Sequence, residues 1–523
     1  MEDQLAQDNF MFRNSFLFVL IIISSIVYSQ NDLDAIRYSR YGVNGTSRFV
    51  ALGGAFGSIG ADVSCAAYNP AGLGLYRKGE ITFSGGLRTT NNDGIINSKS
   101  SSITNAVFTF NNFGILGGWA AKNDPESRNI IAFTNSQTQS FSNKTRMSSY
   151  TNSSSILKDM VNIANEKQNI NNLNSFYEGM AYQTYLLDFD TINNKFISLV
   201  DTKRAIKQTR DIVTSGKVNE LNFSYAYAYK DEFYFGASLG LPRLEYISTT
   251  THSEVDDKDS MRFEYAPGST STYSTTYNEP VTNLHKEYAG LLGFNSLSYT
   301  EYFKTKGSGV NFKIGGIARV SDFFRLGFYY HTPTVYTLKD EYYNSMSASF
   351  DKNPTKPETT KDPVDGGYFN YKIVTPGRVS VNAAIVIKKI SVIGIDYEMI
   401  NYKTSSLSSD QVSDFAGVNA VIKTKYKSGH NLRVGTEFNI KPLMLRFGYN
   451  MQGSPFGAAF TGNFVRNSYS IGAGFRTKNN FYVDLVWVKT ISNEDYYFFN
   501  NLPQKANIKY NATNVSATIG IKF

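Results

Sequence analysis

The feature that most constrains this chain is an alternation, from residue 80 onward, between apolar side chains and small or polar ones. From Leu221 to Tyr229 the odd-numbered positions are apolar or aromatic, and the positions between them are Asn, Ser and Ala. Successive side chains of a strand point to opposite faces, so each such segment predicts a strand with one apolar face. The pattern recurs at Phe233–Leu241, Leu443–Asn450 and Tyr469–Arg476.

The composition fits strands that have lipid on one side and water on the other. Charged residues make up 18% of the 523 residues, below the roughly 25% of ordinary globular proteins, and aromatic residues make up 15%. A lone cysteine, Cys65, excludes a disulfide framework, and four histidines disfavour a zinc site. Few charges and many aromatic residues are typical of transmembrane β-barrels.

The connections between the expected strands alternate between short and long. Short turns are predicted near Lys122–Arg128, Lys230–Glu232, Val320–Phe323, Lys388–Ile390, Ile440–Pro442 and Lys478–Asn480. Long connections are predicted near 91–111, 142–217, 251–307, 338–367, 403–427, 453–465 and 492–509. Six short and seven long connections predict an all-β fold, a 14-stranded antiparallel transmembrane barrel, whose third strand lies near Asn129–Phe141.

The last predicted strand is apolar at every second position from Val515 to the terminal Phe523. An ordinary edge strand of a soluble sheet could show the same alternation. An alternating strand that ends on an aromatic residue resembles the signal read by the machinery that assembles outer-membrane barrels. We therefore expect this machinery to be a partner of the chain.

The first 29 residues have the pattern of a secretory signal peptide. Arg13 is followed by an apolar run, Phe16–Val27, which is too short for the roughly 20 residues of a membrane-spanning helix. Small residues at the expected −3 and −1 positions favour cleavage before Gln30, and we expect translation to start at Met11.

Residues 30–79 lack the strand pattern and are expected to form a hatch, a compact plug inside the barrel of residues 80–523. Their glycines, Gly53 and Gly54 among them, allow close backbone packing. The sequence GGAFGSIG lacks the spacing of a dinucleotide-binding loop. Asn69, Pro70 and Ala71 follow within NPAGLG.

This glycine-rich segment, its Asn-Pro-Ala motif and the 14 expected strands resemble the FadL/TodX family of transporters of hydrophobic compounds. The resemblance implies a hatch whose gating residues include Asn69, Pro70, Ala71, Gly53 and Gly54. It also implies that a ligand held against the hatch leaves sideways through a gap at the third strand. Some relatives in this family are labelled hemin receptors, and others serve protein export, so the fold does not fix the cargo.

Polar side chains on the faces opposite the apolar stripes are expected to line the lumen. These are Arg325, His331, Arg433, Glu437, Arg446, Asn450, Arg476 and Asp484. They fit a charge network that braces the wall. Arg325, Arg433, Arg446, Arg476 and His331 also fit a ligand site, because a guanidinium pairs with a carboxylate in bidentate fashion.

Two external segments have helical spacing of their apolar residues. One is 155–167, and the other contains Leu173, Phe176, Tyr177 and Met180. Such helices fit a cap that buries its apolar face against other loops. Phe176, Tyr177 and Met180 also fit a landing surface for a ligand.

The sequence thus predicts passive uptake of a hydrophobic small molecule, such as a long-chain fatty acid, across the outer membrane of a Gram-negative bacterium. The alternatives are a hemin receptor and a barrel that docks a secretion or surface-assembly partner. No triad-like pattern accompanies His331, so we expect neither an enzyme nor a bound cofactor. The net charge of +8, without a compact basic cluster, favours lipopolysaccharide and other outer-membrane lipid as partners over nucleic acid.

Overall fold

The structure is a computed structural model. It describes residues 32–122, 124–190, 193–198, 205–258, 263–265, 272–274, 294–350, 358–361, 366–388, 390–410, 415–457, 464–498 and 505–523. The expected signal peptide, residues 1–29, lies outside this part of the chain.

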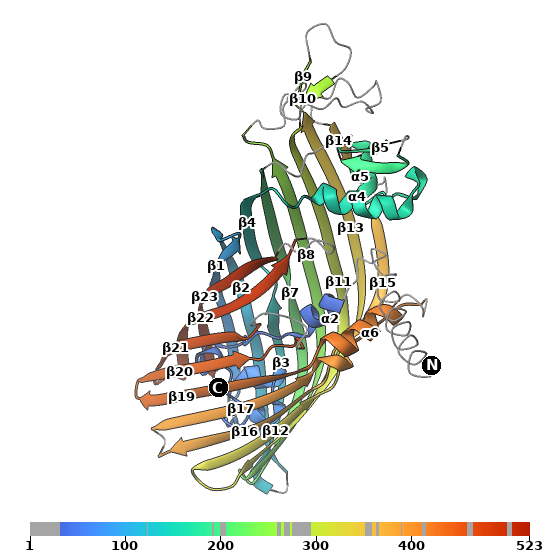
Figure 1. Ribbon diagram of the computed structural model, residues 1–523. Coiled ribbons are helices and arrows are strands. Elements are labelled where there is room, and N and C mark those ends of the chain that lie inside the picture. Colours follow the sequence, from blue (N-terminus) through green and yellow to red (C-terminus); the bar gives the residue numbers. More distant parts are fainter. Residues whose placement is uncertain are drawn as a thin grey trace, which may run out of the picture.

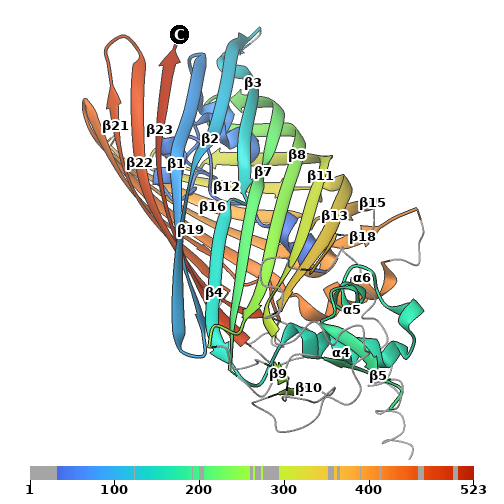
Figure 2. The ribbon, with the colours of Figure 1, turned by 90° about the horizontal axis from the view of Figure 1, so that it is seen from above.

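Fourteen antiparallel strands close into a barrel (Figures 1 and 2). The last strand pairs with the first, with Glu80 opposite Lys522, so the ring has no free edge. Four of the fourteen positions are occupied by two segments in succession, which are β3 with β4, β12 with β13, β15 with β16, and β17 with β18. The predicted fold class and strand number are confirmed.

The elements have the following bounds. The strands are β1 Glu80–Ile96, β2 Lys99–Ala121, β3 Asp124–Ser140, β4 Asn143–Thr151, β5 Leu187–Asp190, β6 Lys195–Ser198, β7 Ile206–Tyr229, β8 Phe233–Val255, β9 Phe263–Tyr265, β10 Thr272–Ser274, β11 Phe294–Arg319, β12 Phe324–His331, β13 Val335–Phe350, β14 Glu358–Lys361, β15 Gly367–Val374, β16 Arg378–Ile387, β17 Ser391–Asn401, β18 Ser406–Ser408, β19 Ser428–Ile440, β20 Leu443–Gln452, β21 Arg466–Arg476, β22 Phe481–Tyr497 and β23 Lys505–Lys522. The helices are α2 Asp32–Ser39, α3 Ser47–Ala51, η1 Val63–Ala67, η2 Pro70–Leu75, α4 Ile156–Lys167, η3 Ile170–Asn172, α5 Glu178–Gln183, η5 Tyr402–Thr404 and α6 Ala416–Lys425.

The outer surface of the barrel carries an apolar band. Phe223, Phe235 and Phe312 point outward and are exposed. Asn222 and Ser224, which flank Phe223 in sequence, are buried. On β7, β8 and β11 the outward apolar residues span Leu221–Tyr229, Phe233–Leu241 and Val310–Ala318, close to the roughly 9–11 residues with which a strand crosses a membrane. A closed barrel with this band is suited to a lipid surrounding.

Among the residues that the structure describes, no helix is long and apolar enough to cross a membrane.

One side of the barrel is much taller than the other (Figure 1). Strands β7, β8 and β11 have 24, 23 and 26 residues, whereas β16, β17 and β20 have 10, 11 and 10. The long connection predicted at 91–111 is wrong, because β1 and β2 stay paired up to a two-residue turn at Asn97–Ser98. Above the apolar band the strands no longer need an apolar face, so the alternation that reveals a strand disappears.

Residues 32–79 lie inside the ring, where Figure 2 shows their short helices surrounded by strands. Phe49, Phe56 and Ile59 pack in one buried cluster with the inward-facing wall residues Leu116 and Ala226. Small inward-facing side chains on the wall leave the volume that this segment fills.

The predicted helix at 155–167 is confirmed as α4. With α5, β5 and β6 it forms a cap that packs on the extensions of β8, β11 and β13 (Figure 1). The Glu254 carboxylate of β8 accepts hydrogen bonds from the Ser155 hydroxyl at 2.6 Å and the Ile156 N–H at 2.8 Å. This carboxylate joins the start of α4 to the wall.

Candidate functional site

The Asn-Pro-Ala motif forms a capped turn pressed against the wall. The Asn69 side chain accepts a hydrogen bond from the Ala71 N–H at 3.1 Å, and its amide donates to the Gly57 carbonyl at 2.6 Å. Pro70 occupies the first position of η2, where a missing N–H costs nothing. A Cβ on Gly236 or Gly315 of the wall would collide with this turn.

Gly53 lies where the hatch meets β20, and Gly54 lies beside Arg433 of β19. Their φ angles of +62° and +80° are in the left-handed region that favours glycine. A Cβ on Gly53 would lie 2.6 Å from the carbonyl oxygen of Tyr449. Backbone therefore packs directly on backbone at this contact.

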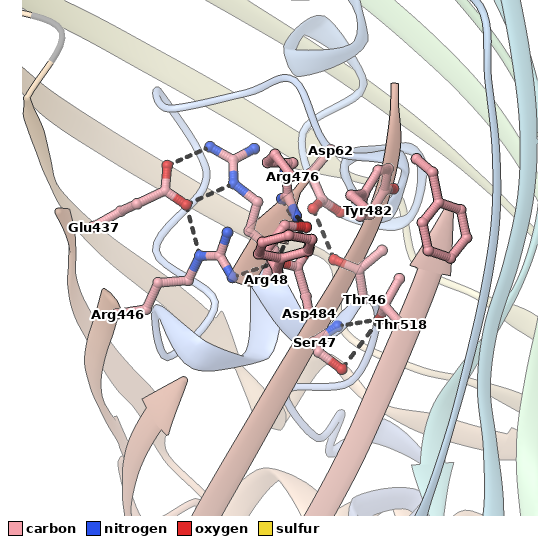
Figure 3. A network of polar contacts seen from close by, with 12 residues as sticks. Thr46, Ser47, Arg48, Asp62, Glu437, Arg446, Arg476, Tyr482, Asp484 and Thr518 are labelled. Atoms are coloured by element: carbon pink, nitrogen blue, oxygen red, sulfur yellow. Dashed lines mark hydrogen bonds and ion pairs between the residues drawn. The ribbon is translucent and has the colours of Figure 1, made fainter. Parts of the chain in front are cut away.

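A chain of ion pairs joins the hatch to the wall (Figure 3). Arg48 of the hatch donates to both carboxylate oxygens of Glu437, each at 3.0 Å. Arg446 donates to Glu437 at 2.6 Å and to Asp484 at 2.7 Å, and Arg476 donates to both oxygens of Asp484 at 2.8 and 2.9 Å. Three arginines thus share two carboxylates.

Three other predicted lumen residues, Arg325, His331 and Arg433, contact the hatch or a barrel carboxylate, whereas Asn450 lines a cavity beside the hatch. Arg433 donates to Glu398 at 2.8 Å. The Nε2 atom of His331 lies 2.6 Å from the Tyr68 carbonyl, and Arg325 donates to the Ile59 carbonyl at 3.1 Å. These contacts use the side chains to brace the hatch, and their role in ligand binding stays a prediction.

The three predicted cap residues lie in or beneath the cap. The Phe176 carbonyl accepts a hydrogen bond from the Tyr299 hydroxyl at 2.9 Å. The Tyr177 hydroxyl donates to Asp159 at 2.8 Å, and Met180 is buried. Their role as a ligand surface likewise stays a prediction.

The wall is interrupted at the third strand, which the sequence places at Asn129–Phe141. The ladder between β2 and β3 stops at the pair Asn112 and Ser136. Each strand carries one extra residue there, Asn111 in β2 and Thr138 in β3. Among the described ladders β4, which follows Ser140 after two residues, pairs with β7 alone.

The extra residue in β3 changes the direction of the side chains that follow it. Before Thr138 the even-numbered side chains face inward, and after it Phe141 packs inward, edge-on to Tyr38 and Tyr246. The Thr138 carbonyl accepts a hydrogen bond from the Gly42 N–H at 2.9 Å. The hatch therefore holds the third strand in its interrupted form.

A cavity of about 120 Å³ lies beside this interruption. Its lining includes Arg40–Asn44, Val50 and Gly53 of the hatch, Thr109 and Asn111 of β2, and Gln137, Gln139 and Ser140 of β3, with the remainder on β1 and β20–β23. Polar side chains dominate this lining, so the cavity suits a polar group better than a hydrocarbon chain.

Two arginines in the cavity lining differ from those of the bracing networks. Arg466 donates to Glu494 at 3.0 Å, but Arg40 and Arg88 form no ion pair with any described residue. Arg88 shares the inward parity of Thr82 and is therefore detectable by alternation in β1. Arg40 lies beyond α2, where no periodicity indicates its direction.

The outer face of the same wall carries an apolar groove of about 890 Å³. Its lining is Ile115–Trp119 of β2, Ile131–Phe133 of β3, Phe223–Tyr225 of β7, Ala237–Leu239 of β8, Phe312 and Phe523. The groove begins close to the end of the ladder between β2 and β3. A polar inner cavity and an apolar outer groove thus lie near the same interruption.

The described residues contain no group of three His, Cys, Asp or Glu side chains that could hold a metal ion.

When the chain is compared with known proteins, matches are found among solved structures. No protein-family model and no curated protein matches the chain. The Pseudomonas putida toluene transporter TodX is 12% identical with a TM-score of 0.49, over 92% of this chain and 99% of that one. A Pseudomonas aeruginosa FadL homologue is 12% identical with a TM-score of 0.49, over 91% and 98%. The Ralstonia pickettii toluene transporter TbuX is 13% identical with a TM-score of 0.46, over 92% and 99%.

Proposed function

We propose that this barrel carries a hydrophobic small molecule with an acidic head group, such as a long-chain fatty acid, passively across the outer membrane of a Gram-negative bacterium. The observation that carries the proposal is the interruption of the wall at Thr138, with a cavity inside it and an apolar groove outside it. The ligand is held beside the hatch and leaves sideways into the lipid.

The hatch favours a sideways route over an axial one. Its residues from Thr46 to Ala71 are almost all buried, and they contact β8, β11, β20 and β22 on different sides of the ring. A ligand moving along the axis would have to break those contacts. At the third strand it would meet the hatch segment around Gly42, the Asn92 side chain that joins β1 to the start of β4, and a wall in which β2 and β3 lack ladder hydrogen bonds.

The two parts of a fatty acid fit the two environments. Arg40 and Arg88 have no carboxylate partner among the described residues and would pair with an acidic head group. The hydrocarbon chain would gain roughly 25 cal/mol for each Å² of apolar surface it buries, and the groove of Phe133, Phe223 and Leu239 offers such a surface.

The test is mass spectrometry of the small molecules that co-purify with the protein from outer membranes in mild detergent. A bound fatty acid or similar amphiphile supports the proposal, and the double variant Arg40→Gln, Arg88→Gln should carry less of it. The control is Arg319→Gln, whose guanidinium pairs with Asp322 at 2.6 Å in an exposed turn. Haem in the preparation would favour a hemin receptor. A stoichiometric partner protein with an empty lumen would overturn transport and indicate a docking barrel.

The hatch motif gives a second test. Replacing Asn69, Pro70 and Ala71 together by Gly, Ala and Gly should alter uptake while the barrel still assembles, because the motif contacts the wall without belonging to its ladders. Assembly is read from the heat-dependent migration of the folded barrel in a gel. A variant that does not assemble would make the motif a folding element and remove the support for gating.

A further inference from the structure

Two neighbouring rows of residues cross the outer face of the tall wall formed by β7, β8, β11, β13 and β15 (Figure 1). In each row the residues are direct cross-strand partners. One row reads Asn219, Arg243, Ser308, Thr337 and Lys372, and the next reads Lys217, Glu245, Lys306, Lys339 and Asn370. We call the five cations of these rows, Lys217, Arg243, Lys306, Lys339 and Lys372, the basic belt.

The basic belt follows the edge of the apolar band. Two residues closer to the short turns, the outward residues of the same five strands are Leu221, Leu241, Val310, Val335 and Val374. On every strand the change from aliphatic to cationic, hydroxyl or amide side chains therefore comes at the same place. On the far side of the belt, Tyr302 and Tyr343 stack with their ring centroids 4.4 Å apart. This order of aliphatic, cationic and aromatic groups is expected where a hydrocarbon layer ends.

The charge of the basic belt is largely uncompensated. Glu245 is the one carboxylate in the two rows, and it accepts from Lys306 at 2.9 Å. The ammonium of Lys339 lies 4.7 Å from the centre of the Tyr368 ring. Within the described part of the chain, Lys217, Arg243 and Lys372 form no ion pair, and all five cations are exposed. Such a row is suited to an anionic surface.

We propose that the basic belt binds the phosphate groups of a phosphorylated glycolipid in the outer leaflet, whose acyl chains then lie along the apolar band. This assignment rests on the outer-membrane placement proposed above, and it adds a second, lipid ligand to the cargo. Lys306 and Lys339 are direct partners, so their Cβ atoms are about 5 Å apart and both ammonium groups can contact one phosphate. The Ser308 and Thr337 hydroxyls, in the neighbouring row, are available as further donors.

The probe is lipid A with two phosphates, added to the detergent-solubilised full chain and detected as a bound mass by native mass spectrometry. The variant is Arg243→Gln, Lys306→Gln, Lys339→Gln. Each surface cation contributes roughly a five-fold factor to binding at an anionic membrane surface, so the affinity of the triple variant should fall on the order of a hundred-fold. Phosphate-free lipid A should bind the wild type as weakly as the diphosphate form binds the variant.

The control removes the same charge elsewhere. The control variant changes three exposed lysines in the short turns at the opposite end of the strands, Lys122→Gln, Lys388→Gln and Lys478→Gln. It should bind lipid A like the wild type. A second variant, Lys306→Arg, Lys339→Arg, keeps the charge and should retain binding. Equal binding of phosphorylated and phosphate-free lipid A, or unchanged affinity in the glutamine variant, would overturn the proposal. An effect with free phosphate or phosphatidylglycerol equal to that of lipid A would also overturn it. Cargo uptake, measured in parallel, separates this result from the proposed function, because the belt variant should keep it.

Discussion

At the scale of single residues, Arg446 shows why paired charges sit inside this barrel. Its side chain is fully buried and lies between the largely buried Glu437 and the fully buried Asp484, so it neutralises two carboxylates that have little or no contact with water. Removing one member of a buried ion pair is strongly destabilising, because the charge that remains is left uncompensated, whereas replacing the whole pair by apolar side chains often costs little. The bracing network of Arg48, Arg446 and Arg476 therefore depends most on its central member.

We predict that Arg446→Met lowers the free energy of unfolding by about 3–5 kcal/mol, because it leaves Glu437 with only Arg48 and Asp484 with only Arg476. Urea titration in detergent measures this quantity. Arg476→Met should cost less, since Arg476 is partly exposed and Arg446 still pairs with Asp484. A loss of ligand binding in Arg446→Met without any loss of stability would contradict bracing and favour a ligand site.

A second prediction concerns Gly53, where the hatch touches the backbone of β20. Gly53→Ala adds a methyl group beside Tyr449 at a φ of +62° and should cost about 1–3 kcal/mol. Limited proteolysis of residues 40–60 in the folded barrel reports loosening of the hatch. The matched control is Gly117→Ala, whose added Cβ meets nothing within 4 Å. Equal protection of the hatch in both variants would show that the contact is not tight.

How far the sequence predicts single residues depends on periodicity. The alternation of apolar and polar side chains along each strand predicts four charged residues in the lumen, and the structure has them there. They are Arg433, Arg446, Arg476 and Asp484. Their partners in the hatch, such as Arg48, could not be foreseen, since a short irregular segment has no repeating pattern.

At the scale of elements, the sequence predicts best where a strand has lipid on one face. The six short turns fall where expected, because each ends an apolar stripe. The sequence is wrong about the upper parts of β1, β2, β7, β8 and β11, which are strands in the structure but fall within the predicted long connections. The extra residue Thr138 in the third strand is also invisible, since neither Gly nor Pro marks it, and its carbonyl is held by a hatch residue distant in sequence.

The cap offers a prediction at this scale. Glu254→Gln should release the start of α4, because the buried carboxylate accepts hydrogen bonds from Ser155, Ile156 and the Gln208 amide, the last at 2.8 Å. Charge-assisted bonds to a helix start are worth about 1–2 kcal/mol. Amide hydrogen exchange should therefore become faster across 156–183 and stay unchanged in the lower half of β8. Glu245→Gln, exposed on the same strand, is the control. Unchanged exchange in α4 would show that apolar contacts alone hold the cap.

At the scale of the whole molecule, the barrel combines a closed ring, a tightly packed hatch and the interruption of the wall at the third strand. Thr138 connects them, because its carbonyl binds the hatch and its insertion turns Phe141 into the lumen. Deleting Thr138 would keep every pairing of β3 with β7 on both sides of the bulge, since Gln137 and Gln139 already face the consecutive residues Asn219 and Val218. The deletion removes the bulge of β3 and keeps its pairing with β7, and we expect the straightened strand to close the interruption.

The most direct test is the initial rate of fluorescent fatty acid entry into lipid vesicles that contain the purified barrel, compared between the wild type and the Thr138 deletion. Deletion of Asn295, the extra residue of a bulge far up β11, serves as the control, and both variants must show the heat-dependent gel migration of a folded barrel. If the ligand leaves through the third strand, the Thr138 deletion should fall to the rate of empty vesicles while the Asn295 deletion keeps the wild-type rate. Wild-type entry through a folded Thr138 deletion would contradict sideways release.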